Sequence, residues 1–236
     1  MRLRVLVRKI HKWLALIIGI QVLLWTATGL FMSFVPIEKI RSEHLVKKNK
    51  PVLLNQRESF ISIKEILSQN NESPIKISLR SLIDKYVYEV QFSEKMELYD
   101  ALTGDRITPI NKDMASRIAV SHFLGDAQIK GAELIEDAPI EYRGKLPVWR
   151  IDFANSENST FYVSPETGQL LSRRGTLWRI YDFMWMLHIM DYQERENFNH
   201  WWLVLAALLA VSMSASGIWL IFYSFRKREF KFPIKR

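Results

Sequence analysis

The fold is decided by an uncharged run at residues 13–37, WLALIIGIQVLLWTATGLFMSFVPI. A second uncharged run of equal length, WWLVLAALLAVSMSASGIWLIFYSF, occupies residues 201–225. About 20 apolar residues in a helix span a hydrocarbon core roughly 30 Å thick, so each run is long enough to cross a bilayer. The sequence therefore predicts a membrane protein with two transmembrane helices, at 13–37 and 199–225.

The net charge of +8 belongs to the two ends of the chain. Residues 1–12 hold five Lys/Arg and no acid, and residues 225–236 hold six Lys/Arg and one acid. The two ends together therefore have a net charge of +10, and the rest of the chain has −2. Basic flanks of transmembrane helices usually face the cytoplasm. We therefore expect cytoplasmic tails at 1–12 and 226–236, a bacterial inner-membrane location and a periplasmic central domain. The lipid bilayer, and not nucleic acid, is the partner that this charge distribution indicates.

A cleaved signal peptide is the alternative interpretation of the first run. Signal peptides have a shorter apolar core and small residues at the cleavage site. Here the run is long and leads into Phe31-Met32-Ser33-Phe34, which favours an uncleaved anchor. The chain has no cysteine, which excludes disulfides, thiolate metal sites and cysteine nucleophiles.

The central part contains a sequence pattern that occurs twice. After a predicted stalk at 38–58, the runs VYEVQF (87–92) and MELYD (96–100) end in a Thr-Gly turn, and so do VWRIDF (148–153) and TFYV (160–163). Alternating apolar and polar residues separated by turn residues are typical of β-hairpins. A helical segment comes before each hairpin: one is capped by Ser62, and the other by Asn111 or Asp113.

Further strand candidates lie at 75–82 and 127–137, between each helix and its hairpin. The pattern predicts two units, 59–110 and 111–175, each with a helix over an antiparallel sheet of about three strands. The expected fold class is therefore a membrane protein of α+β type, with two transmembrane helices flanking a duplicated domain.

Residues 182–192, DFMWMLHIMDY, belong to a predicted amphipathic helix at 176–192 that lies along the outer membrane surface. On a helix, Met184, His188 and Asp191 share one face. One hypothesis makes His188 a haem or metal ligand whose imidazole is oriented by Asp191. Met184 is the alternative ligand, because thioether and imidazole suit copper(I). The other interpretation is an apolar stripe with methionines as gap-fillers.

A bis-histidine haem needs two neutral imidazoles in apolar surroundings. The candidates are His11, at the inner end of the first span, and His188 and His200, which share the outer side. His11 has no partner on its own side, so a second copy or another subunit would have to supply one. We expect His44 and His122 to have structural or exposed positions. No nucleophile elbow, phosphate-binding loop or dinucleotide motif occurs, so we do not expect an enzyme by itself.

The segment 11–30 carries His11, Trp13 and Leu14 at one end and Thr28-Gly29-Leu30 at the other, and thereby resembles the opening helix of the PepSY-associated transmembrane proteins. The turn with Asp100, Thr103 and Gly104 is similar to the Asp-x-x-Thr-Gly signature of PepSY units, although Ser164 replaces the aspartate in the second copy. LHIMDY and SGIWLIF are also similar to this family. The resemblance covers nearly the whole chain.

The resemblance implies three functional alternatives. Longer members, usually with four spans, are similar to iron or siderophore reductases in which intramembrane histidines hold b-type haems, so haem b is the implied cofactor. The first alternative is a non-catalytic accessory or binding subunit of an envelope iron, haem or redox system. The second is a haem-b electron-transfer protein working as a homodimer or with a partner membrane subunit. The third is a membrane-tethered inhibitor or sensor that binds a periplasmic protein, since PepSY units elsewhere act as inhibitory modules.

Overall fold

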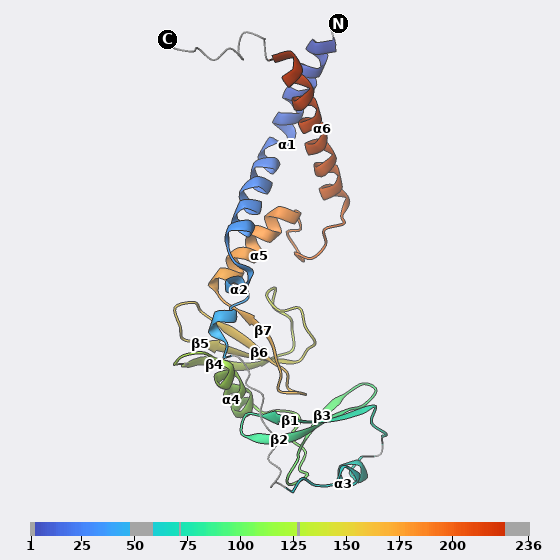
Figure 1. Ribbon diagram of the computed structural model, residues 1–236, viewed down its shortest axis with the longest axis vertical. Helices are drawn as coiled ribbons and strands as arrows, with labels where there is room; N and C mark the ends of the chain where they lie inside the picture. Colours follow the sequence, from blue (N-terminus) through green and yellow to red (C-terminus); the bar gives the residue numbers. More distant parts are fainter. Residues whose placement is uncertain (1–2, 48–58, 71, 127, 225–236) are drawn as a thin grey trace, which may run out of the picture. The chain divides into compact units, whose positions relative to one another are not determined.

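The computed structural model describes residues 3–47, 59–70, 72–126 and 128–224. The chain forms two compact units, one from Met1–Pro36 with Tyr181–Arg236 and the other from Ile37–Ile180. Figure 1 gives the order and labels of the elements. The predicted tail at 226–236 and the part of the predicted stalk at 48–58 lie outside the described residues.

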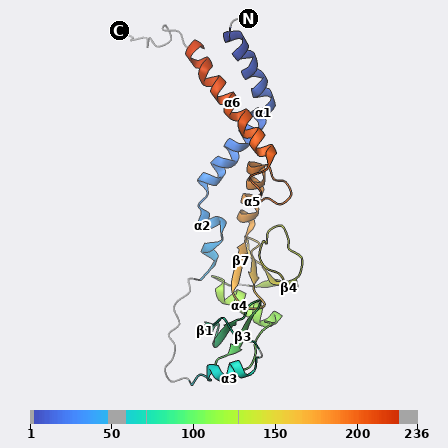
Figure 2. The same cartoon turned by 90° about the vertical axis from the view of Figure 1, so that its right-hand side faces the viewer.

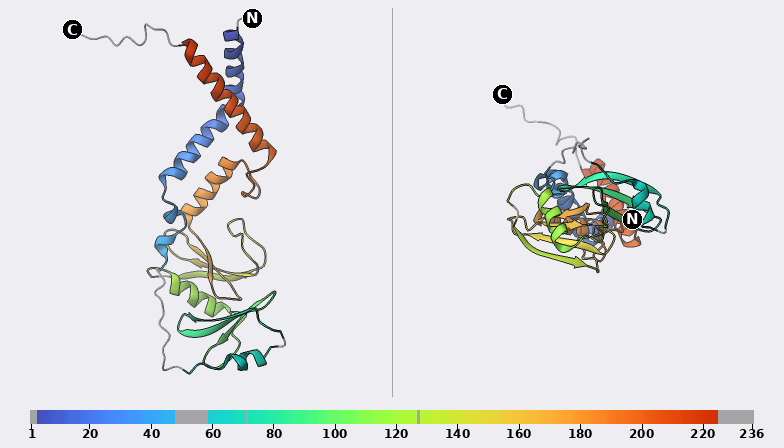
Figure 3. Two further views of the ribbon diagram at one scale, coloured as in Figure 1. Left: turned by 45° about the vertical axis from the view of Figure 1, so that its right-hand side comes forward. Right: turned by 90° about the horizontal axis from the view of Figure 1, so that it is seen from below.

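Two long helices, α1 (Leu3–Phe34) and α6 (Trp201–Ser224), dominate the first unit. They pack on each other and cross, as Figures 2 and 3 show. Only 11% and 6% of their most apolar windows is buried, so most of this apolar surface faces outward. A core helix of a soluble protein would bury it. The two predicted spans are therefore confirmed as helices long and apolar enough to cross a membrane, and α1 also includes the described part of the predicted N-terminal tail.

The predicted helix at 176–192 is present as α5 (Thr176–Ile189). It ends three residues early because Met190 has a φ of +58°. A residue in this left-handed conformation is the usual terminator of a helix, although glycine or asparagine normally occupies the position.

The second unit contains two antiparallel sheets, in the orders β1-β2-β3 and β4-β5-β6-β7. The α+β class is thereby confirmed. The second sheet has one strand more than the sequence predicts, namely β7. The strands are β1 (Lys76–Leu82), β2 (Lys85–Gln91), β3 (Met96–Asp100), β4 (Ile129–Ile135), β5 (Val148–Phe153), β6 (Thr160–Val163) and β7 (Leu170–Arg174). The short helices are α2 (Ile37–Ile40), the 3-10 helix η1 (Glu43–Leu45), α3 (Ile63–Ser68) and α4 (Lys112–His122).

Helix α4 covers the larger sheet, as Figure 2 shows beside β4. Asn111 caps it, with its side-chain oxygen accepting a hydrogen bond from the Met114 amide at 2.9 Å. Ile118 of α4 is buried with Ile151 and Phe161 of the sheet. The smaller sheet has its own core, in which Ile66 of α3 packs with aromatic and aliphatic side chains of β2 and β3 (Tyr88, Val90, Tyr99).

The turns after β3 and β6 have the same pattern of hydrogen bonds. Asp100 Oδ1 accepts from the amides two and three residues later, and Ser164 Oγ does the same in the second turn. The amides of Gly104 and Gly168 donate to the carbonyls of Asp100 and Ser164, at 2.9 and 2.8 Å. Serine therefore forms the same turn that aspartate forms in the first sheet.

Replacing Gly168 with alanine should destabilise the second unit by about 1–3 kcal/mol. Gly168 has a φ of +65°, and an added Cβ would lie 2.7 Å from Ile110 Cδ1 and 3.0 Å from Ile118 Cδ1. Thermal unfolding of the full chain, followed by circular dichroism, measures the loss. The matched control is Gly131→Ala in β4, where an added Cβ meets nothing within 4 Å. Equal melting temperatures for the two variants would contradict the prediction.

Candidate functional site

His188, in the last turn of α5, meets α1 at Thr28. Its Nδ1 atom lies 2.8 Å from Thr28 Oγ1. The Thr28 hydroxyl has a single proton, and it donates this proton to the Leu24 carbonyl at 2.7 Å. With this assignment Thr28 Oγ1 accepts from His188, and the imidazole proton lies on Nδ1. The Nε2 atom of His188 keeps its lone pair.

His11 has the same tautomer at the other end of α1. Its Nδ1 lies 2.9 Å from Ser216 Oγ and 3.1 Å from the Met213 carbonyl oxygen, both on α6. A carbonyl only accepts, and Ser216 already donates its own proton to the same carbonyl at 2.8 Å. Nδ1 is therefore the donor, and Nε2 of His11 also keeps its lone pair. Gly217 allows this close approach, because a Cβ there would lie 3.1 Å from His11 Cε1.

In this assignment each of the two rings donates through Nδ1 and leaves Nε2 without a proton. A ligating histidine is neutral, binds through one ring nitrogen, and has its tautomer fixed by a hydrogen bond at the other. Within residues 3–47, 59–70, 72–126 and 128–224, neither Nε2 takes part in a hydrogen bond. Thr28 and Ser216 were not identified from the sequence as the residues that fix the two rings.

His11 and Thr28 are 17 positions apart on one helix. At a rise of 1.5 Å per residue this corresponds to about 25 Å, against a hydrocarbon core of roughly 30 Å. The two imidazoles therefore lie near opposite ends of a span.

His200 has a different role. Its Nε2 lies 2.9 Å from the Ile189 carbonyl oxygen and must donate to it, and its Nδ1 accepts from the Leu203 amide at 3.3 Å. Both ring nitrogens are thus used in joining the end of α5 to the start of α6. The structure argues against His200 as a ligand and against its predicted pairing with His188.

Asp191 does not orient His188 as the sequence predicted, because α5 ends before it. Its carboxylate instead accepts from four backbone amides of the following loop, at 3.0–3.3 Å (Gln193, Glu194, Glu196 and Asn197). Burial raises the pKa of Asp191, but these four hydrogen bonds together outweigh it and hold the pKa below its ordinary value. Asp191 organises the loop, and Thr28 takes the place predicted for it.

Met184 lies one helical turn before His188 on α5, half-buried, as the sequence predicted. Its role as an alternative ligand stays a prediction. In the described part of the chain, no group of three His, Asp or Glu side chains has the arrangement of a metal site.

Side chains satisfy the last three carbonyls of α5. Gln21 and Trp25 of α1 donate to the Leu187 and His188 carbonyls at 3.4 and 2.6 Å, and His200 donates to that of Ile189. A helix that ends in apolar surroundings needs such partners, because no water is available for its last carbonyls. This arrangement fixes the position of His188 against α1.

The hydrogen bonds that orient His11 and His188 belong to a chain that a family model matches over nearly its whole length. The model of the PepSY-associated TM region matches residues 8–236. The chain belongs to this family. It is accordingly a membrane protein with a PepSY domain, and the resemblance noted in the sequence is confirmed. No curated protein and no solved structure matches the chain.

Proposed function

We propose that this PepSY-associated membrane protein is an accessory or binding subunit of a bacterial envelope iron or haem redox system, and that His11 and His188 bind b-type haem through Nε2. The main support for the proposal is that His11 and His188 have the same tautomer. Each ring has its proton held on Nδ1 by an acceptor on a neighbouring helix, which leaves Nε2 as a ligand. When bound, the haem would supply one-electron chemistry.

Haem fits these residues better than a bare metal ion. The porphyrin would supply most of the ligands of the iron, so one or two imidazoles of the protein would suffice. A bare ion needs three or four protein ligands, and the described residues offer no such cluster around either ring.

The second axial ligand would come from another chain. One chain brings a single such imidazole to each site, and about 25 Å of helix separates the two sites. A homodimer or a partner membrane subunit would complete each haem, which makes transmembrane electron transfer by such an assembly the alternative to a purely accessory role.

We place the haem of His11 on the cytoplasmic side of the inner membrane and that of His188 on the periplasmic side. The basic residues before and after the spans support this orientation. We further propose that residues 59–110 and 111–175 are two copies of a PepSY unit on the periplasmic side. The matching hydrogen bonds of the turns at Gly104 and Gly168 support this duplication.

The test is a dithionite-reduced minus oxidised absorption spectrum of the detergent-purified full chain, expressed with haem supplied. We expect b-type α and Soret bands at near-stoichiometric haem, and a mass from light scattering that shows whether a dimer carries it. A His11→Ala/His188→Ala double variant should lose the bands. A featureless spectrum of the unmodified protein, or full haem content in the double variant, would overturn the proposal.

A further inference from the structure

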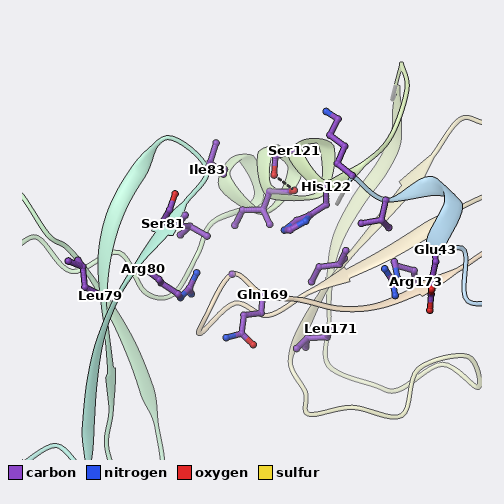
Figure 4. Close-up of a pocket in the computed structure, with 16 residues that line it drawn as sticks. Glu43, Leu79, Arg80, Ser81, Ile83, Ser121, His122, Gln169, Leu171 and Arg173 are labelled. Atoms are coloured by element: carbon purple, nitrogen blue, oxygen red, sulfur yellow. Dashed lines mark hydrogen bonds between the residues drawn. The ribbon is translucent and has the colours of Figure 1, made fainter. Parts of the chain in front are cut away.

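A large groove lies within the second unit, between strands β1 and β7, as Figure 4 shows. Its volume is about 1220 Å³. Leu79–Ile83 form one wall, Gly168–Leu171 and Arg173 form the other, and the end of α4 with Ser121 and His122 lies along the groove. Small-molecule sites usually have about 300–1,000 Å³, so this groove is larger than that class requires.

Both walls of the groove are terminal strands. In the described sheets, β1 pairs with β2 alone and β7 pairs with β6 alone. A terminal strand has one edge whose backbone amides and carbonyls have no partner in the sheet. An extended peptide binds such an edge by adding a strand, with the backbone giving affinity and the side-chain pockets giving specificity. A groove walled by two terminal strands is suited to an extended polypeptide.

The charge of the groove indicates what kind of polypeptide would bind there. Lys47, Arg80 and Arg173 line it together with one carboxylate, Glu43, which Figure 4 shows beside Arg173. Because Glu89 forms an ion pair with Arg80, the groove has an excess of one positive charge. Arg80 is fixed in place, since its Nε donates to Glu89 at 2.8 Å and its Nη2 to the Thr167 carbonyl.

His122 lies in the lining of the groove, near the positive charge of Arg173. Burial and, after it, the charge of Arg173 lower the pKa of this imidazole, which is neutral at pH 7. The positive charge of Arg173 near His122 would favour a ligand with carboxylates.

We propose that this groove binds an extended, acidic segment of a partner protein by strand addition. The proposal does not depend on haem. The groove would then be a protein-binding surface of the second unit. The edges of β1 and β7 would form hydrogen bonds with the peptide backbone, and the basic side chains would attract its carboxylates.

The test uses the full chain in nanodiscs of zwitterionic lipid and three labelled peptides of equal length. One alternates Glu and Val, one alternates Lys and Val, and one is the Glu-Val peptide N-methylated at alternate residues. We expect fluorescence anisotropy to show binding of the first alone. The N-methylated peptide keeps its charge but lacks the backbone N–H groups needed for strand addition. If the acidic peptide bound only by attraction to the basic tails, the two acidic peptides would bind equally well. Equal binding of all three, equal binding of the two acidic peptides, or no binding of the first would overturn the proposal.

Variants locate the site. Reversing two charges of the lining, Lys47→Glu with Arg173→Glu, should lower the affinity for the Glu-Val peptide by about tenfold or more. Ser121→Trp should do the same by filling the exposed end of the groove. The matched control is Lys130→Glu, an exposed lysine on β4 that does not line the groove. Loss of binding in the control, or unchanged binding in the lining variants that stay folded by circular dichroism, would contradict the assignment.

Discussion

Replacing His188 with alanine should remove the haem proposed at the α5 end of α1 and lower the haem content of the purified protein by about half. The reason is that no described residue replaces this imidazole. His200, the nearest alternative in the sequence, uses both ring nitrogens in hydrogen bonds to Ile189 and Leu203. Asp191 is bound by four backbone amides of its own loop. Haem quantified as its pyridine complex, relative to protein, measures the loss.

Two variants separate ligation from general damage to this end of the helix. Thr28→Val keeps the volume of the side chain but removes the acceptor that holds the Nδ1 proton, and changes of this kind typically cost about 10–100-fold in metal affinity. The Thr28 variant should therefore retain haem at high concentration, with a shifted reduction potential. His200→Ala should keep the haem content. Unchanged haem in His188→Ala, or an equal loss in His200→Ala, would show that the assignment of the ligand is wrong.

The overall architecture was predictable because its signals are local. The spans at 13–37 and 201–225 depend only on apolar length, and both appear as helices, although α1 begins at Leu3. The strands of the two sheets follow alternation and turn residues, which act within a few residues of each other. The extra strand β7 was missed because the Thr-Gly turn before it was taken as the end of the hairpin. In the first sheet the corresponding stretch forms only the bridge between Tyr99 and Arg106.

The site was only partly predictable because its decisive contacts are long-range. His11 and His188 stand out by residue type, but their tautomers depend on Ser216 and Thr28, which are 205 and 160 positions away. The proposed role of Asp191 assumed that the helix continues to residue 192. Met190 adopts a left-handed conformation that methionine rarely takes, so no local rule placed the helix end at Ile189.

An ion pair between buried Asp182 and partly buried Arg195 holds the loop between α5 and α6, and its loss should be among the most damaging changes in the first unit. Asp182 Oδ2 accepts from Arg195 Nη1 at 2.5 Å, with side chains only 6% and 21% exposed. Trp185 of α5 donates to the Arg195 carbonyl at 3.1 Å, so the loop is fixed through both the backbone and the side chain of Arg195. Asp182→Leu should destabilise the unit by about 3–5 kcal/mol, because it leaves a guanidinium in a poorly hydrated place without its carboxylate.

The double variant Asp182→Leu/Arg195→Met decides whether the pair itself causes the loss. Replacing both partners of a buried ion pair with apolar residues of similar volume is often neutral or stabilising, so the double variant should melt well above the single variant. Thermal unfolding of the detergent-solubilised chain, followed by tryptophan fluorescence, should show the single variant lowered by on the order of 10 °C. If both variants lose the same stability, the contribution comes from packing at residue 182 and not from charge. Since the loop positions His200 and the end of α5, the single variant should also lower haem content at His188, and the double variant should restore it.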